Sequence, residues 1–242
     1  MRLEVDIAGK TFKSAAGEQH DVIAGVTFAL NAGEAGVLVG PSGCGKSTML
    51  RILAGLDPDF QGRIARPAGA RIGFVFQEPR LLPWRSVEDN VRIAAPLADD
   101  AKLSALFEIL ELKAHRNHFP GELSLGLARR VALARAFAVE PQLLILDEPL
   151  ASLDAALAAR LRDEIAILMD GRSMITLLVT HDVDDAVRLG DRVILLSPRP
   201  ARILADVPIR TPRSARGDAE TAAIKSEIMR RINGSPAKQD AS

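Results

Sequence analysis

A glycine-rich turn between an apolar run and a helical pattern constrains the fold of this chain more than any other feature. The apolar run covers residues 35–39, and after the turn Met49, Leu50 and Leu53 recur at helical spacing. We therefore predict a buried strand, a tight turn and a helix that ends at Gly55, where a left-handed cap is easily adopted. The turn fits the pattern G-x-x-x-x-G-K-[ST] with Gly40, Pro41, Ser42, Gly43, Cys44, Gly45, Lys46 and Ser47, and Thr48 follows it.

The glycines of this turn allow successive backbone N–H groups to point at phosphate oxygens, because no side chain blocks the approach. The positive end of the helix dipole adds to this attraction. In such a site Lys46 bridges the β- and γ-phosphates, and the Ser47 hydroxyl binds Mg²⁺. The alternative, a glycine-rich turn with a surface lysine, is disfavoured by the strand and the helix on either side. No guanine-reading N-K-x-D motif occurs in the sequence, which favours ATP over GTP.

Cys44 is the only cysteine, so no disulfide can form within the chain. Its place near a helix N-terminus can lower the pKa of the thiol. Side chains at the variable positions of such a turn point away from phosphate, and only the backbone contacts it. We therefore expect a modifiable thiol without a catalytic role.

Two acids, Asp147 and Glu148, follow the apolar run at residues 143–146. Carboxylates there are costly to bury unless they meet a cation or hydrogen-bond donors. Because neighbouring strand residues point to opposite sides, we assign the two acids different roles. Asp147 would complete the Mg²⁺ shell with Ser47, and Glu148 would polarise the attacking water. Taken in isolation the pair is better explained as a solvated acidic turn, but the phosphate-binding pattern upstream favours the site.

Two further polar residues also follow predicted strands. Gln77 comes after residues 72–76 and would hold Mg²⁺ or a water molecule, and His181 comes after residues 175–179 and would bind a γ-phosphate. Taken alone, Gln77 carries little information, and His181 is better explained as a solvated or capping residue. Ligands bind at the carboxyl ends of the strands in an open α/β sheet, and all of these residues lie at predicted strand ends.

Strands alternate with helices along the chain, which predicts a parallel sheet covered by helices. The block at residues 87–139 has mostly helical spacing, and it interrupts the series of strands. From residue 211 the composition becomes polar, with a short amphipathic patch at residues 224–232 and a final stretch, residues 233–242, that we expect to be disordered. The other expected elements are a strand with alternating Leu3, Val5 and Ile7, a hairpin loop at residues 13–21, strands at residues 22–30 and 193–196, and helices at residues 155–169 and 182–189.

The composition excludes several classes of protein. The 31 Lys and Arg residues balance 31 Asp and Glu residues, whereas nucleic-acid-binding domains usually carry an excess of basic residues. The N-terminal segment has acids where a signal peptide needs an apolar run, and no window approaches the roughly 18 apolar residues that cross a bilayer. We expect a soluble, cytoplasmic chain whose role at a membrane, if it has one, comes through a partner.

Taken in order, these segments resemble an ATP-binding-cassette (ABC) transporter ATPase over residues 1–210. Residues 40–48 match the Walker A loop, residues 146–149 Walker B and residues 151–154 the D-loop, while Gln77 matches the Q-loop and His181 the switch histidine. The resemblance implies ATP and Mg²⁺ as cofactors. It also places the adenine-stacking aromatic residue on Phe12, for which the alternative is a core strand residue.

The resemblance implies an α/β fold, with a P-loop NTPase sheet, an N-terminal antiparallel β subdomain and a helical subdomain inserted at about residues 78–140. One ATPase domain would cover residues 1–210. Residues 211–242 would form a C-terminal tail with a short helix followed by disorder. In the implied site Lys46, Glu148 and His181 are catalytic, and Ser47, Gln77 and Asp147 hold the metal.

The LSGGQ signature of this family falls on residues 123–127, where the match is imperfect. Ser124 and Gly126 keep the hydroxyl and the small residue that would contact the nucleotide of a partner subunit, and a strong helical pattern follows. Leu125 adds bulk beside the phosphate, and Leu127 replaces an amide. We expect the site to be retained; whether the two leucines slow hydrolysis stays open.

The segment from Glu78 to Asn90 resembles importer ATPases of the nitrate, sulfonate and taurine type. In this family the segment lies against the permease, so Leu81, Leu82 and Trp84 would form part of a docking groove. The alternative is a hydrophobic anchor that fixes the helical subdomain. Elsewhere, His115 and His118 suggest a pair of metal ligands, but no third ligand is close in sequence, and a solvated loop explains them better.

The resemblance therefore implies an importer ATPase in which a homodimer sandwiches two ATP molecules. It would drive transmembrane permease subunits at the inner face of the membrane, served indirectly by a solute-binding protein, without nucleic acid. A cassette ATPase that acts on DNA or ribosomes would need a coiled-coil insertion or a second cassette, and the sequence has neither. A regulatory subunit that binds ATP and hydrolyses it weakly is favoured only by Leu125 and Leu127. The sequence does not identify the solute.

Overall fold

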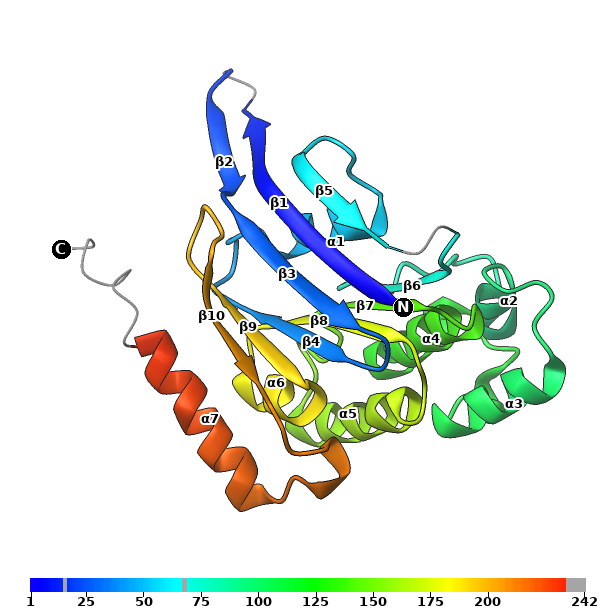
Figure 1. Cartoon of the computed structure of the whole chain (residues 1–242). Coiled ribbons are helices and arrows are strands. Elements are labelled where there is room, and N and C mark those ends of the chain that lie inside the picture. Colours follow the sequence, from blue (N-terminus) through cyan, green and yellow to red (C-terminus); the bar gives the residue numbers. More distant parts are fainter. Residues whose placement is uncertain (15–16, 67–68, 234–242) are drawn as a thin grey trace. The chain divides into compact units, whose positions relative to one another are not determined.

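The chain forms two units, one of which is inserted in the sequence of the other. The computed structural model describes residues 1–14, 17–66 and 69–233. The first unit comprises residues 1–68 and 177–242, and the second comprises residues 69–176. Both units mix helices and strands (Figure 1). In the described part of the chain, no helix combines the length and the apolar character that a membrane crossing requires.

An antiparallel sheet begins the first unit, with β1 pairing β2, β3 and β5. The expected alternation in β1 is confirmed, because Leu3, Val5 and Ile7 are buried. The single strand expected at residues 22–30 is wrong: Gly25 has a φ of 85° and breaks it into two strands. The expected hairpin loop is shorter, since β2 already begins at Gln19. The four strands are β1 (Arg2–Lys13), β2 (Gln19–Ile23), β3 (Val26–Asn31) and β5 (Gln61–Ala65).

The other strands of the first unit follow the order β10, β9, β4, β8. β4 runs parallel to β9, and β10 returns antiparallel to β9. The predicted helix after β4 is confirmed, and it ends at Gly55 with a φ of 77°. These elements are β4 (Ala35–Val39), α1 (Lys46–Ala54), β8 (Ile175–Thr180, in this unit from Leu177), α6 (Val183–Leu189), β9 (Arg192–Leu196) and β10 (Ile203–Pro208).

In the second unit, two parallel strands pack against a set of helices. The expected helical character of residues 87–139 is confirmed, although the block is divided into three α-helices and two short 3₁₀ turns. Gly73 allows β6 to approach α4, since a Cβ atom there would lie 2.4 Å from the carbonyl oxygen of Ala136. The elements are β6 (Ile72–Val75), α2 (Val87–Arg92), α3 (Asp100–Ile109), η1 (Lys113–His115), η2 (Pro120–Glu122), α4 (Leu125–Ala138), β7 (Leu143–Asp147) and α5 (Ala155–Met169).

The C-terminal segment of the first unit is a structured part of that unit. After η3 (Arg213–Ala215), the helix α7 (Asp218–Asn233) packs against α6, with Ile228 fully buried (Figure 1). The amphipathic patch expected at residues 224–232 is therefore the second half of a longer helix. Of the stretch that we expected to be disordered, Asn233 ends this helix, and residues 234–242 lie outside the described residues.

Arg216 holds this segment to the end of α6. Its side chain is only 2% exposed, and its Nη1 donates to the carbonyl oxygens of Val187 and Gly190, both at 2.6 Å. Its Nε donates to the carbonyl oxygen of Thr211 at 2.8 Å. The last carbonyls of a helix have no partner within the helix, so the guanidinium satisfies groups that would otherwise be buried without one.

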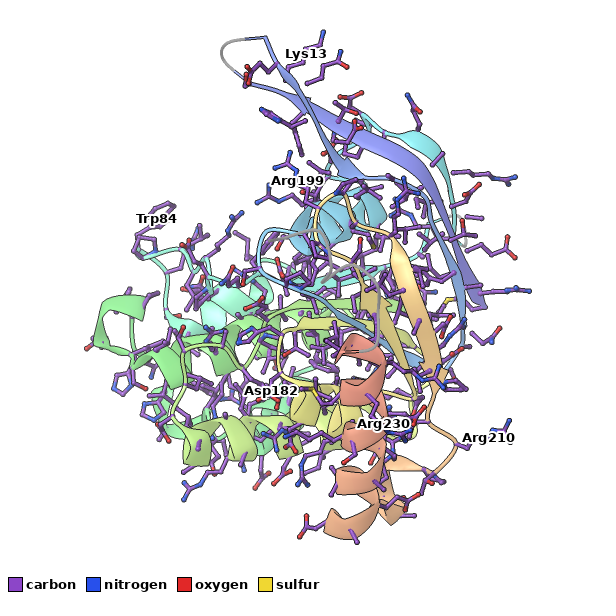
Figure 2. The ribbon with its side chains drawn as sticks, turned by 90° about the vertical axis from the view of Figure 1, so that its left-hand side faces the viewer. Lys13, Trp84, Asp182, Arg199, Arg210 and Arg230 are labelled. Atoms are coloured by element: carbon purple, nitrogen blue, oxygen red, sulfur yellow. The ribbon has the colours of Figure 1, made fainter. Side chains whose placement is uncertain are left out.

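We predict that Arg216→Ala destabilises the chain. The substitution leaves buried carbonyl oxygens without a donor, which costs on the order of 1–3 kcal/mol. At about 2–4 °C per kcal/mol for a chain of this size, the thermal midpoint should fall by several degrees. Arg210→Ala is the matched control, because Arg210 is exposed and Figure 2 shows it pointing away from the ribbon. Equal midpoints for the two variants, measured by calorimetry, would contradict this role of Arg216.

Candidate nucleotide-binding site

The predicted phosphate-binding turn lies between β4 and α1, as the sequence indicates. Gly43 and Gly45 have φ values of 76° and 116°, which L side chains rarely adopt. A Cβ atom on Gly45 would also lie 2.8 Å from Cγ1 and 3.1 Å from the carbonyl oxygen of Val22. The turn therefore requires glycine at this position for its backbone angles and for its packing.

The charge of Lys46 is held inside this turn. Its Nζ donates to the carbonyl oxygens of Gly40 at 2.8 Å and Pro41 at 2.9 Å, and the residue is 5% exposed. The residue before α1, Gly45, has no side chain that could cap the helix. The first N–H groups of α1 and the Lys46 ammonium are the donors that an anion such as phosphate requires.

The environment of Cys44 differs from what we expected. The residue is 1% exposed, and burial raises the pKa of its thiol more than the nearby Lys46 ammonium lowers it. The expected modifiable thiol with a lowered pKa is therefore wrong, because desolvation of the thiolate outweighs the helix end and the lysine. Its Sγ packs beside Gly40, where a Cβ atom would lie 3.1 Å from it.

Two other predicted site residues belong to the first unit. Phe12 lies on β1 with 43% of its surface exposed. The alternative interpretation of Phe12, that it is a core strand residue, is therefore wrong. The Nζ of Lys10 lies 4.7 Å from the centroid of the Phe12 ring. His181 follows β8 and is exposed. The capping role weighed for His181 falls instead on Asp182, labelled in Figure 2, whose Oδ1 accepts the N–H of Asp184 at 2.7 Å.

The acidic pair of the second unit ends β7, in which every residue is buried. Asp147 is 6% exposed, and Glu148 is half-buried with a φ of 46°. A left-handed backbone is uncommon for a residue other than glycine and indicates that the surroundings hold it. The chain turns again at Ser152, with a φ of 63°, before Asp154 caps α5.

Arg129 contacts the loop after β7, a contact that the sequence patterns do not predict. Its guanidinium donates to the carbonyl oxygens of Glu148, Pro149 and Ala151 at 3.1, 3.0 and 2.6 Å. The sequence run from Ala128 to Arg135 predicts a helix but does not indicate that Arg129 and Arg130 are both buried. An arginine on an otherwise apolar helix face would have been the only signal.

The signature region forms the N-terminus of α4. Ser124 is exposed and caps the helix, since its Oγ accepts the N–H of Leu127 at 3.3 Å. A hydroxyl that accepts one bond still has its own proton to donate. Gly126 is fixed by packing, because a Cβ atom there would lie 2.6 Å from Cδ2 of Leu157. Leu125 is 46% exposed, so the bulk that the sequence analysis noted stands at the surface.

The predicted docking segment, from Glu78 to Asn90, is held by hydrogen bonds within the second unit. The fully buried Asn90 accepts the N–H of Leu82 at 2.7 Å and donates to the carbonyl oxygens of Leu82 and Arg85 at 3.1 and 3.0 Å. Trp84 is 70% exposed, and Figure 2 shows it projecting outward. The alternative of a buried hydrophobic anchor is therefore wrong for Trp84. Gln77, which precedes this segment, is exposed.

The two histidines that suggested a metal pair lie close together. The Nδ1 atoms of His115 and His118 are 2.9 Å apart, which is a hydrogen-bond distance. Among the described residues, no group of three or more His, Cys, Asp and Glu side chains could hold a metal ion. The pair therefore gains no third ligand of these types from the fold.

The predicted site residues are divided between the two units. Those of the first unit are Phe12, Gly40, Pro41, Ser42, Gly43, Cys44, Gly45, Lys46, Ser47, Thr48 and His181. Those of the second unit are Gln77, Ser124, Gly126, Asp147 and Glu148. Within each unit the residues stand at strand ends, at a helix N-terminus or in the loops that adjoin them, as the sequence indicated.

The sequence of this chain is similar to those of known proteins. The sequence profile of the ABC transporter family matches residues 23–151. An aliphatic sulfonates import ATP-binding protein of Pseudomonas syringae pv. tomato is 42% identical over 217 residues, which cover 88% of this chain and 93% of the relative. Its namesake in Bacillus subtilis is 37% identical over 240 residues, which cover 95% of this chain and 93% of that protein.

Solved structures give the same result for the fold. A dimeric ATP-binding cassette in a post-hydrolysis state, bound to ADP and phosphate, has a TM-score of 0.73 at 28% identity and covers 88% of this chain and 100% of its own. A second dimeric structure of a bacterial ABC transporter cassette has a TM-score of 0.74 at the same identity and coverage. The predicted α/β cassette fold is thus confirmed. With the phosphate-binding turn and the profile match in agreement, the chain belongs to the ABC transporter family as an ATP-hydrolysing cassette.

Proposed function

We propose that this chain is the ATPase subunit of an importer for a small sulfonate-like solute. The observation that carries the proposal is the turn from Gly40 to Lys46, which presents backbone and ammonium donors at the N-terminus of α1. The two relatives described above are named as import ATP-binding proteins for aliphatic sulfonates. Their identity of 37–42% over most of the chain supports the same class of solute here.

In the proposed site, Lys46 binds the β- and γ-phosphates, Glu148 orients and deprotonates the attacking water, and His181 contacts the γ-phosphate. Phe12 stacks on the adenine. Ser47, Gln77 and Asp147 offer a hydroxyl, an amide and a carboxylate, all of them oxygen donors of the kind that Mg²⁺ prefers. The ion would neutralise charge on the transferred phosphoryl group.

We propose that the working form is a homodimer. The exposed Ser124 hydroxyl at the N-terminus of α4 would donate to the γ-phosphate held by the other copy, with Gly126 keeping the backbone close. Phosphoryl transfer is catalysed mainly by positioning and electrostatics, so turnover would depend on closure of the dimer. The dimeric state of the solved cassettes supports this assembly.

The importer also requires permease subunits and a solute-binding protein. The segment from Glu78 to Asn90 would dock the permease, because Asn90 fixes its backbone while Trp84 stands free at the surface. This chain would then work at the cytoplasmic face of the membrane. The alternatives of a regulatory cassette and of a cassette that acts on DNA or ribosomes are not favoured, since the relatives are named import subunits.

We predict that Glu148→Gln abolishes rapid turnover while ATP binding continues. Loss of a general base costs roughly 10²–10⁴-fold in rate. An ATP-bound dimer should then accumulate, measured by size-exclusion chromatography with light scattering. The matched control is Glu108→Gln, which neutralises an exposed carboxylate of the same unit and should keep the normal rate. Rapid hydrolysis by Glu148→Gln would remove this residue from the mechanism.

We predict that Trp84→Ala weakens binding to the permease without destabilising the chain. An exposed tryptophan contributes little to folding, whereas a buried interface tryptophan often contributes more than 2 kcal/mol to binding. Affinity for the permease subunits, measured after reconstitution in detergent, should fall by about tenfold or more. The control is Leu97→Ala, which removes an apolar side chain of the same unit that is 97% exposed. Equal affinities for the two variants would refute the docking role.

A further inference from the structure

The arginine at position 129 is buried, yet it makes its hydrogen bonds to backbone carbonyls. The residue is 6% exposed, and its guanidinium donates to Glu148 O, Pro149 O and Ala151 O at 3.1, 3.0 and 2.6 Å. A guanidinium presents donors in a rigid planar fork, so three bonds of this kind fix the loop in direction as well as in distance.

The loop that Arg129 holds has an unusual backbone. Glu148 and Ser152 have positive φ values of 46° and 63°, although neither is glycine. Residues persist in such conformations only where the surrounding structure determines them. The carbonyl oxygen of Glu148 also accepts the N–H of Ala151 at 3.2 Å, which closes the turn on itself. Arg129 supplies three bonds to this loop from α4.

Burial of the Arg129 guanidinium removes its charge from water, which is unfavourable. Desolvation lowers the pKa of Arg129, and the neighbouring Glu148 carboxylate raises it in part. The Nε of the same side chain is buried and has no hydrogen-bond partner among the described residues. A neutral side chain would avoid this cost but could not hold three carbonyls at once.

We propose that Arg129 is a positioning residue for hydrolysis, which sets the backbone at Glu148 and so aims its carboxylate at the attacking water. This inference rests on the proposed role of Glu148 as the base. Arg129 follows the signature residues on α4, so the helix that begins beside Ser124 is tied directly to the loop that carries Glu148. Arg129 itself does not contact the substrate.

The test compares Arg129→Lys and Arg129→Gln with the wild-type chain by steady-state ATP hydrolysis. A lysine keeps the charge but loses the fork, and a glutamine loses both. Because a misplacement of about 1 Å can cost about 100-fold, we expect kcat to fall 10- to 100-fold, less for lysine than for glutamine. KM for ATP should stay within about twofold, since the phosphate-binding turn is unchanged.

The matched control is Arg71→Gln. The Nε of Arg71 also donates to backbone carbonyls of the same unit, those of Val139 and Glu140 at 2.8 and 3.0 Å, but it does so after the far end of α4. Its loss should leave kcat near the wild-type value. Thermal unfolding of every variant shows whether the chain is folded at the assay temperature, and Arg129→Lys serves as the readout if Arg129→Gln is unfolded.

A double variant separates positioning from general damage. If Arg129 acts through Glu148, then Arg129→Lys should reduce the single-turnover rate of Glu148→Gln by no more than about twofold. A further tenfold loss in that background would overturn the inference, as would a kcat for Arg129→Lys no lower than that for Arg71→Gln. If Glu148→Gln alone hydrolyses ATP rapidly, the proposed function of Glu148 fails instead, which is a distinct result.

Discussion

The phosphate-binding turn depends on backbone that no side chain obstructs, and much of the first unit follows from this constraint. Gly45 has a φ of 116°, and a Cβ atom there would touch Val22 of β2, so only glycine fits at this position. The buried strand β4 fixes one end of the turn and α1 fixes the other. An anion site of this kind is built from peptide groups, and the fold supplies their direction.

At three turns of the structure, a Lys or Arg side chain donates hydrogen bonds to backbone carbonyl oxygens. Lys46 binds carbonyls within its own turn, Arg129 binds the loop after β7, and Arg216 binds the end of α6. In each case the buried charge is compensated by hydrogen bonds to carbonyl oxygens. Two of these turns carry residues proposed to act on ATP, and the third closes the helix that follows His181. The same kind of interaction therefore stabilises all three turns.

Much of this arrangement could be predicted from the sequence, because its signals are local. The strand, turn and helix around Lys46 and the helix end at Gly55 follow from short patterns, and the structure confirms them. The strand β5 was missed because its first residues are exposed and lack an apolar alternation. Tertiary contacts explain other differences. Burial of Cys44 reverses the expected pKa direction, and the partners of Asn90 and Arg129 lie 4–8 and 19–22 positions away.

The central claim is that the hydrolytic site needs residues from two copies of the chain. Lys46→Ala removes the phosphate ligand, whereas Ser124→Asp keeps an equally good N-cap on α4 but places a negative charge near the γ-phosphate. Each variant alone should be inactive. A mixed dimer would pair the intact turn of one copy with the intact Ser124 of the other, so an equal mixture should recover up to about a quarter of the wild-type ATPase activity. A mixture no more active than its two components would contradict the claim.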